Sequence, residues 1–428
     1  MQELQRLSEL VVRARADGGD FHAWAGRADE ALQDRSHEVA QQVADLTDGR
    51  QRALLFTAAM LDEAPAATVF RFADRLLSRL GHPEDERPRL DRTDLTRRLH
   101  ELPVKVRGER IHFEGLAYAA AIRTHFWLYY PDLRAAFGDW VADAVTEFAW
   151  LGPADRNHFV ARYTEHALKA DDVRTLTDLV ESWATDGKLL PEAELVLALG
   201  LMSDARGSAF RAKIYEWAVK PGLSSQLARL LTRTCVEAMA PLYPDQALVR
   251  LHHLARREGD HGRPDSAQTA LLELVRQNHA LCVRLLNRVC SGMEKHEFAD
   301  VGIFLVLMDP LPGWVQHDVA VRGWRGVLDL APPAVWSPKV RAWLSAARCE
   351  PDGGARLMRI LIDAADRDVD VLSRFYLLAY DWSAEPDDAS LPHGREDIAA
   401  RFRRAIDRAQ GVEPLDLTAA GVRGGRGN

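Results

Sequence analysis

The sequence predicts an all-α protein in which a winged-helix-like block with one small β-hairpin is followed by an irregular α-solenoid of the HEAT or TPR kind. Two observations lead to this fold class. Along most of the 428 residues, apolar side chains recur at helical spacing, and short breaks of Gly, Pro or Asp separate the runs. Only at 104–113 do apolar and charged residues alternate, which is typical of a strand pair.

The composition fits a large buried core and argues against general nucleic-acid binding. Hydrophobic residues make up 47% of the chain, and the formal net charge is −8. Binding along a nucleic-acid backbone needs a cationic face, because it releases counterions. The four cysteines, Cys235, Cys282, Cys290 and Cys349, have no CxxC spacing. We expect them to be buried thiols in a reducing compartment.

The expected location is the cytoplasm. The first residues carry both acidic and basic side chains and have no apolar run of the signal-peptide kind. No segment of the sequence approaches the ~20 apolar residues that a membrane-spanning helix needs. We therefore expect no membrane contact.

Residues 1–48 are expected to form three short N-terminal helices. Gly18 and Gly19 separate the first helix from the second, and a cap-like turn at Asp34 separates the second from the third. Each helix has a single apolar stripe, so each must pack on the next block or on a neighbouring domain.

Residues 49–115 are predicted to form the winged-helix-like block. Pro65 stands where the first turn of a helix tolerates proline, and Gly81 closes the same helix. The expected elements are helices at 52–61, 66–80 and 93–102 and a hairpin that turns at Gly108-Glu109. Three helices followed by a hairpin is the order of a winged-helix unit.

A winged helix that reads DNA places its third helix in the major groove. Here the candidate contacts are Arg97 and Arg98 on that helix and Lys105, Arg107 and Arg110 on the hairpin. Between 84 and 114, however, eight Lys or Arg residues are balanced by eight Asp or Glu residues. A neutral block is unlike a phosphate-binding surface, so a protein-packing role is favoured and DNA reading is the alternative.

The helix after the hairpin is rich in large side chains, FWLYY at 126–130, and stops at Pro131. Such residues are either interface anchors or the core between the block and the solenoid. They cannot all face inward within one and a half turns. We therefore expect Tyr129 to contact another domain or chain.

Residues 116–383 are predicted to form the solenoid, in which short breaks separate fifteen helices. The expected ranges are 116–130, 132–150, 153–170, 171–185, 191–202, 206–219, 223–240, 244–257, 264–278, 279–292, 295–309, 313–330, 337–348, 353–366 and 368–380. Two Trp-Ala pairs, at Trp183 and Trp217, close helices 34 residues apart, which is the TPR period. The small residues that flank that repeat are missing, so the array is degenerate.

Residues 384–428 are expected to be a polar tail. One amphipathic helix is predicted near 398–409. The last twenty residues would bury little apolar surface, and we expect them to be disordered.

The motifs of common enzymes are missing from the sequence. A phosphate loop needs G-x-x-x-x-G-K-[ST], but in this chain Leu189 follows the only Gly-Lys pair, Gly187-Lys188. No G-x-S-x-G elbow occurs either. A catalytic site assembled from distant loops remains a third, weaker alternative.

The densest set of possible metal ligands is His252, His253, Glu258, Asp260 and His261. A helical zinc site needs ligands at i and i+4 on one face, as in H-E-x-x-H, and this run lacks that spacing. A polar helix end followed by a turn is the favoured interpretation. We therefore predict no metal, no cofactor and no catalytic residue.

Two segments, RALLFTAAMLDEAPAATVFRFADRLL and RIHFEGLAYAAAIRTHFWLYYPDLRAAFGDWV, resemble the region downstream of the nucleotide-binding domain in actinobacterial STAND-type NTPases. In that family a winged-helix segment precedes a helical-repeat sensor. The resemblance covers about residues 20–185 and implies a protein of bacterial signalling or defence whose repeats recognise a partner. The NTPase has no counterpart in this chain, so ATP hydrolysis does not carry over, and the chain is a stand-alone sensor or part of a longer NTPase.

The predicted function is a non-enzymatic helical-repeat scaffold or sensor that binds a protein partner. The alternative is a transcriptional regulator whose winged helix contacts DNA. The oligomeric state and the identity of the partner stay open at this point.

Overall fold

The computed structural model describes residues 8, 11–33, 35–83, 86–114, 117–144, 151–258, 266–276, 278–309, 313, 315–349, 351–386, 391 and 393–412. Among these residues, every regular element except one hairpin is a helix, which confirms the all-α fold class. The chain divides into two compact units, Met1–Thr234 and Cys235–Asn428. The division falls within the range that was expected to form one solenoid.

The first unit contains the hairpin and the first part of the helical array. Its elements are η1 (Arg15–Asp17), α2 (Phe21–Gln33), α3 (Arg35–Asp45), α4 (Gly49–Met60), α5 (Ala66–Arg79), η2 (Arg89–Asp91), α6 (Leu95–His100), β1 (Val104–Arg107), β2 (Arg110–Phe113), α7 (Tyr118–Tyr129), η3 (Pro131–Leu133), α8 (Arg134–Ala144), α9 (Pro153–Lys169), α10 (Val173–Asp186), α11 (Leu190–Met202), α12 (Gly207–Val219) and α13 (Ser225–Thr234).

Helix α4 lies at the centre of the hairpin block. All eight residues from Ala53 to Met60 are buried, because α5, α7 and α9 pack around the helix. The Phe56 ring stacks on Phe137 of α8 at 4.4 Å, and the indole N–H of Trp140 donates to the Phe72 carbonyl oxygen of α5 at 3.1 Å. The block and the helices that follow it therefore share one core.

The hairpin lies where the sequence predicts it. Val104 pairs with Phe113 and Arg107 with Arg110, so the turn has two residues. Gly108, the first of them, has a φ of 63°, which a two-residue turn of this kind requires and glycine adopts at little cost. Helix α6 is shorter than the expected 93–102. It begins after Asp94, whose carboxylate accepts the Arg97 backbone N–H at 3.0 Å.

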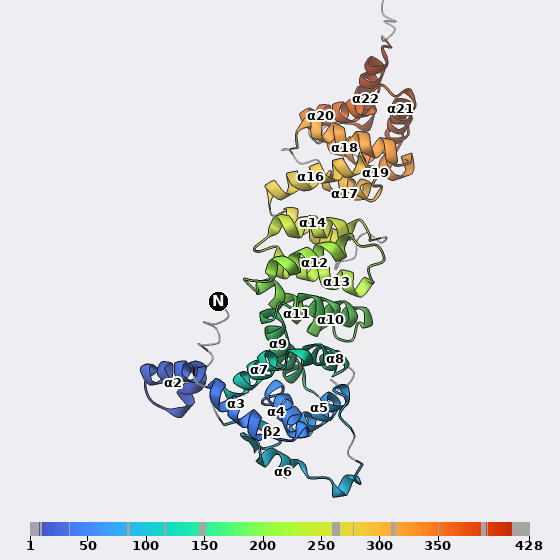
Figure 1. The fold of residues 1–428 in the computed structure, drawn as a ribbon. Coiled ribbons are helices and arrows are strands. Elements are labelled where there is room, and N and C mark those ends of the chain that lie inside the picture. The colour runs from blue at the N-terminus through green and yellow to red at the C-terminus, as the bar shows by residue number, and fades with distance from the viewer. Residues whose placement is uncertain are drawn as a thin grey trace, which may run out of the picture. The chain divides into compact units, whose positions relative to one another are not determined.

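Helices α9 to α13 stack on one another in the way that helical-hairpin arrays do (Figure 1). Both tryptophans of the Trp-Ala pairs, Trp183 and Trp217, are buried in this stack. At Gly200 of α11, a Cβ atom would lie 2.4 Å from the Phe210 ring of α12, so glycine permits this close approach. The helix expected at 223–240 runs from 225 to 239, and its last five residues, Cys235–Met239, are wound as a π-helix.

The second unit is helical throughout its described residues. Its elements are η5 (Cys235–Met239), α14 (Pro244–Ala255), α15 (Ala267–Arg276), α16 (His279–Met293), α17 (Ala299–Leu307), α18 (His317–Leu330), α19 (Pro333–Ala347), α20 (Pro351–Ala365), α21 (Val369–Ser383) and α22 (Arg395–Gln410). Aromatic pairs fill its interior, with Trp324 against Trp343 at 5.0 Å and Trp336 against Phe375 at 5.3 Å. Helix α22 agrees with the helix expected in the tail, and the expectation for the last twenty residues falls mainly on 413–428, outside the described residues.

Candidate partner-binding surfaces

The basic residues proposed for DNA contact have different surroundings. Arg97 and Arg107 are exposed. Arg98 lies over the Phe70 ring of α5 at 5.1 Å, in a cation–π contact. Lys105 forms an ion pair with Glu114 across the base of the hairpin. Part of this set therefore stabilises the block itself.

Arg110 fixes the hairpin to α9. Its Nη1 and Nη2 donate to the two carboxylate oxygens of Asp155 at 2.9 and 3.1 Å, and it also donates to the Glu63 carbonyl oxygen. The hydrogen bond and the charge of Asp155 raise the pKa of Arg110. The guanidinium is thus engaged within the protein rather than directed at a ligand.

Tyr129 lies on the surface at the end of α7. Phe126 and Trp127 of the same helix are buried, whereas Leu128 and Tyr129 are exposed. The Tyr129 ring contacts His125 at 4.8 Å, and burial lowers the pKa of that histidine. The exposed pair is a small apolar patch on the first unit.

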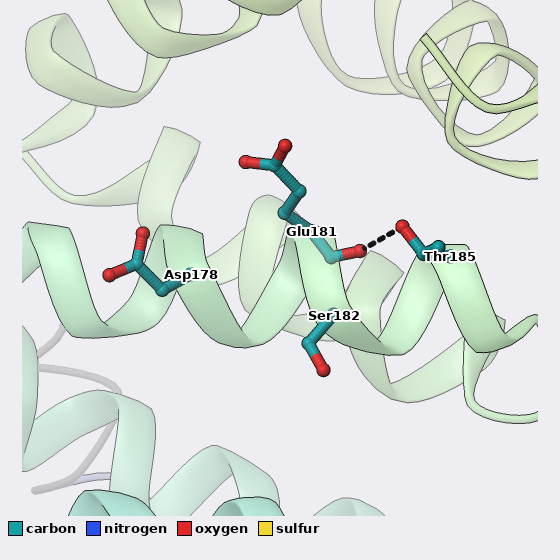
Figure 2. A pocket seen from close by; sticks show the side chains of 4 residues that line it. All are labelled: Asp178, Glu181, Ser182 and Thr185. Atoms are coloured by element: carbon teal, nitrogen blue, oxygen red, sulfur yellow. Dashed lines mark hydrogen bonds between the residues drawn. The ribbon is translucent and has the colours of Figure 1, made fainter.

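A hollow in the first unit lies along α10 and is open to solvent. Its lining residues are Asp178, Glu181, Ser182 and Thr185 (Figure 2). Their spacing of three, four and seven residues places them on one face of the helix. The Thr185 hydroxyl donates to the Glu181 carbonyl oxygen at 2.7 Å, as Figure 2 shows.

Trp217 of α12 and Lys220, which follows that helix, contact Glu181 in the α10 hollow. The indole N–H of Trp217 donates to Glu181 Oε2 at 3.1 Å, and Lys220 Nζ donates to Oε1 at 3.2 Å. Burial opposes ionisation of Glu181, but these hydrogen bonds outweigh it and lower its pKa. Among the residues that the structure describes, Asp178 pairs only with Arg174, at 3.9 Å, and its side chain is 65% exposed.

The second unit contains a buried charge network that joins α14, α16 and α17. Asp300 of α17 accepts His252 Nε2 at 2.8 Å and Arg256 Nε at 2.9 Å on one oxygen, and Arg256 Nη2 at 2.5 Å on the other. Both His252 and Asp300 are fully buried. Burial would raise the pKa of Asp300, but the hydrogen bonds lower it overall, so the carboxylate is ionised.

Arg288 of α16 sets the tautomer of His252. Its Nε donates to His252 Nδ1 at 3.2 Å, so that nitrogen is an acceptor and the proton lies on Nε2, facing Asp300. Burial lowers the pKa of His252, which agrees with a neutral ring. Burial and the nearby Arg288 lower the pKa of His253 to about 4.

The described members of the histidine-rich run contact different parts of the second unit. His252 contacts Asp300, and Glu258 instead accepts the backbone N–H groups of Ala267 and Gln268 at 2.6 and 3.1 Å, at the start of α15. Asp260 and His261 lie outside the described residues. Within the described ranges, no three His, Cys, Asp or Glu side chains are grouped to hold a metal ion.

The cysteines are free thiols. Cys235 and Cys290 are buried as expected, and burial raises their pKa to about 12 and about 11. The expectation of burial is wrong for Cys349, which is exposed, and Cys282 is half-buried.

Comparisons with protein families, with curated proteins and with solved structures found nothing that matches this chain. Of the helices in the described ranges, none combines the length and the apolar character needed to cross a membrane.

Proposed function

We propose that this chain is a non-enzymatic helical-repeat scaffold or sensor whose α10 hollow binds a segment of a protein partner. The observation that carries the proposal is the row of polar side chains along α10, which is open to solvent over two helical turns. Helical-repeat proteins bind partners along such surfaces, because stacked helices present side chains in regular rows.

The chemistry of the hollow favours a segment that brings hydrogen-bond donors and a cationic side chain. Asp178 has an accessible carboxylate, and the Ser182 hydroxyl lies one turn along the same face. Lys220 holds Glu181, so the hollow is less acidic than its two carboxylates suggest. A segment with one Lys or Arg facing Asp178 would fit this pattern.

The resemblance of the sequence to the repeat sensors of STAND-type NTPases supports the same proposal. In that family the repeats recognise a partner, and in this chain the winged-helix-like block would be a docking or relay element. The Arg110 clamp on Asp155 gives this chain a physical link between the hairpin and α9, next to the helix that carries the hollow.

A photo-crosslinking residue at Ser182 tests the proposal in cells of the source organism. We expect a discrete protein to be captured from position 182, and we expect Asp178→Arg to abolish its capture. The same crosslinker at Leu90, an exposed position on η2, is the matched control. Equal capture from both positions, or capture that Asp178→Arg leaves unchanged, would contradict the proposal.

DNA reading is the rival function, and one observation favours it. Arg97 on α6 and Arg107 at the hairpin turn are exposed, in the order of elements that a winged helix uses. This function predicts salt-dependent duplex binding that Arg97→Ala with Arg107→Ala removes. A genomic DNA pool that is not shifted at low salt would eliminate it.

A further inference from the structure

Helix α21 in the second unit has apolar side chains on two opposite faces. Leu372, Phe375 and Ala379 are buried against neighbouring helices. On the other side Leu377 is 62% exposed and Tyr380 61% exposed. The solvent-facing stripe comprises Val369, Tyr376, Leu377 and Tyr380, at positions that share one helical face.

Three exposed charges, Asp370, Arg374 and Asp381, flank this stripe on one side. Arg374 and Asp381 are both exposed, and they lie seven residues apart, which is two helical turns along the same flank. Neither side chain forms an ion pair with a residue that the structure describes. Arg374 stands three residues before Leu377, and Asp381 stands four residues after it.

This spacing makes the stripe complementary to itself when one copy is reversed. In an antiparallel helix pair with a two-fold axis, the same flank of each helix meets. With the axis next to Leu377, Arg374 faces Asp381 of the partner subunit, and the reverse contact follows by symmetry. In a parallel two-fold pair, by contrast, this flank would meet the tyrosine flank of the partner subunit, so Arg374 and Asp381 would not face one another.

We propose that the α21 stripe is the interface of a homodimer in which α21 pairs antiparallel with α21 of a second copy. Leu377 lies at the centre of the contact, with the Arg374–Asp381 pairs on one flank and the tyrosines on the other. The occupant is a second copy of this chain, because a reversed copy of the helix places an opposite charge against both Arg374 and Asp381. Asp370 then faces Glu385 of the partner subunit, whose charge Arg341 and Arg395 already balance.

Side chains around the stripe favour close packing of a second helix. Ser373 and Ala384 lie along its centre and are small and exposed, so they permit two helices to approach. On the tyrosine flank, Arg403 of α22 lies 6.0 Å from both the Tyr376 and Tyr380 rings and is itself paired with Glu396. This arrangement orients the rings before association, which lowers the entropic cost of binding.

The test is the mass of the full chain in solution, measured by sedimentation over a range of concentrations. We expect a dimer for the natural chain and a monomer for Leu377→Asp, because a buried charge would face its own copy. Leu242→Asp is the matched control, since Leu242 is also exposed in the second unit and lies outside the stripe. Circular dichroism checks that all variants keep their helix content.

Charge reversal distinguishes a second copy from any other occupant. Arg374→Asp and Asp381→Arg should each weaken the dimer about tenfold, because each places like charges opposite one another. The double variant should recover the natural affinity, since it restores opposite charges across the axis. A monomeric natural chain, a dimer that survives Leu377→Asp, or a double variant no tighter than the single ones would each overturn the proposal.

Discussion

The two units each contain an arginine that holds an aspartate with both of its carboxylate oxygens, but in different surroundings. In the first unit, Arg110 and Asp155 are 48% and 10% exposed. In the second, Arg256 and Asp300 are 17% and 0% exposed, and the buried His252 shares the same carboxylate. The two pairs have similar geometry and differ mainly in access to water.

This difference in exposure decides how much each ion pair contributes to the free energy of unfolding. An exposed ion pair stabilises a protein by about 0–1 kcal/mol, because water and salt screen its charges. Removal of one partner from a buried pair costs about 3–5 kcal/mol, because the other charge is left without compensation. The hairpin clamp should therefore be expendable for folding, whereas the Asp300 network should not.

Asp300→Ala should have the largest effect, a loss of about 3–5 kcal/mol in the free energy of unfolding. Arg256 would remain partly buried without its carboxylate, and His252 would lose the acceptor of its proton. Urea unfolding of the full chain, followed by circular dichroism, measures the loss. Asp363→Ala is the control, because Asp363 pairs with His317 at 2.8 Å on the surface. Equal effects of the two variants would refute the distinction between buried and exposed pairs.

Gly292→Ala should destabilise the same network by steric crowding rather than by removal of a charge. A Cβ at Gly292 of α16 would lie 1.7 Å from Asp300 Oδ2 and 2.3 Å from Arg256 Nη2. We expect a loss of about 1–3 kcal/mol from this overpacking, despite the better helix propensity of alanine. The control is Gly313→Ala, where a new Cβ meets nothing within 4 Å. Unchanged unfolding of Gly292→Ala would show that the network can move aside.

The elements that the sequence predicted well depend on local signals. Alternation at 104–113 and a glycine at the turn are sufficient for the hairpin. Pro65 and Gly81 bound α5 within a residue or two of the expected 66–80, because proline and glycine act at fixed positions next to a helix. The third helix was overestimated, since an apolar pattern does not reveal that Asp94 caps a shorter one.

The network around Asp300 was not predicted from the sequence, because its members are far apart in the chain. His252 and Asp300 are separated by 48 residues, and only the packing of α14 against α16 and of α16 against α17 brings them together. The histidine was instead grouped with its neighbours in the chain as a weak metal candidate. One signal was present, since Asp300 is the only charge in the otherwise apolar run ADVGIFLVL. A charge within such a run indicates a buried partner.

Low pH should reduce the stability of the second unit, because its folded state disfavours protonation of His252 and His253. The folded-state pKa values of His252 and His253 lie below the ordinary value of 6.5, that of His253 at about 4. Below pH 6.5 the unfolded chain therefore binds protons that the folded chain does not. Stability should fall as the pH falls from 6.5 toward 4, by up to about 1.36 kcal/mol per pH unit for each such group.

Unfolding of the full chain at pH 7.5, 6.5 and 5.5 measures this loss. His253→Gln should reduce the dependence of the free energy of unfolding on pH below pH 6.5. Asp300 does not contribute in this window, because its pKa is lowered and its stabilisation is lost only in stronger acid. If the free energy of unfolding falls with pH equally in His253→Gln and in the natural chain, His253 is not a source of the loss.

Asp155→Ala should have the smallest effect, a loss of about 0–1 kcal/mol that shrinks further in high salt. The hairpin would keep its place without the clamp, because backbone hydrogen bonds also hold it. Ala66 N–H donates to the Glu109 carbonyl oxygen at 2.8 Å, and Ile111 N–H donates to the Ala64 carbonyl oxygen at 3.1 Å. Urea unfolding at low and high salt tests this expectation. A loss as large as that of Asp300→Ala would mean that the clamp joins the hairpin to α9 more tightly than its exposure implies, and would strengthen its proposed role as a relay.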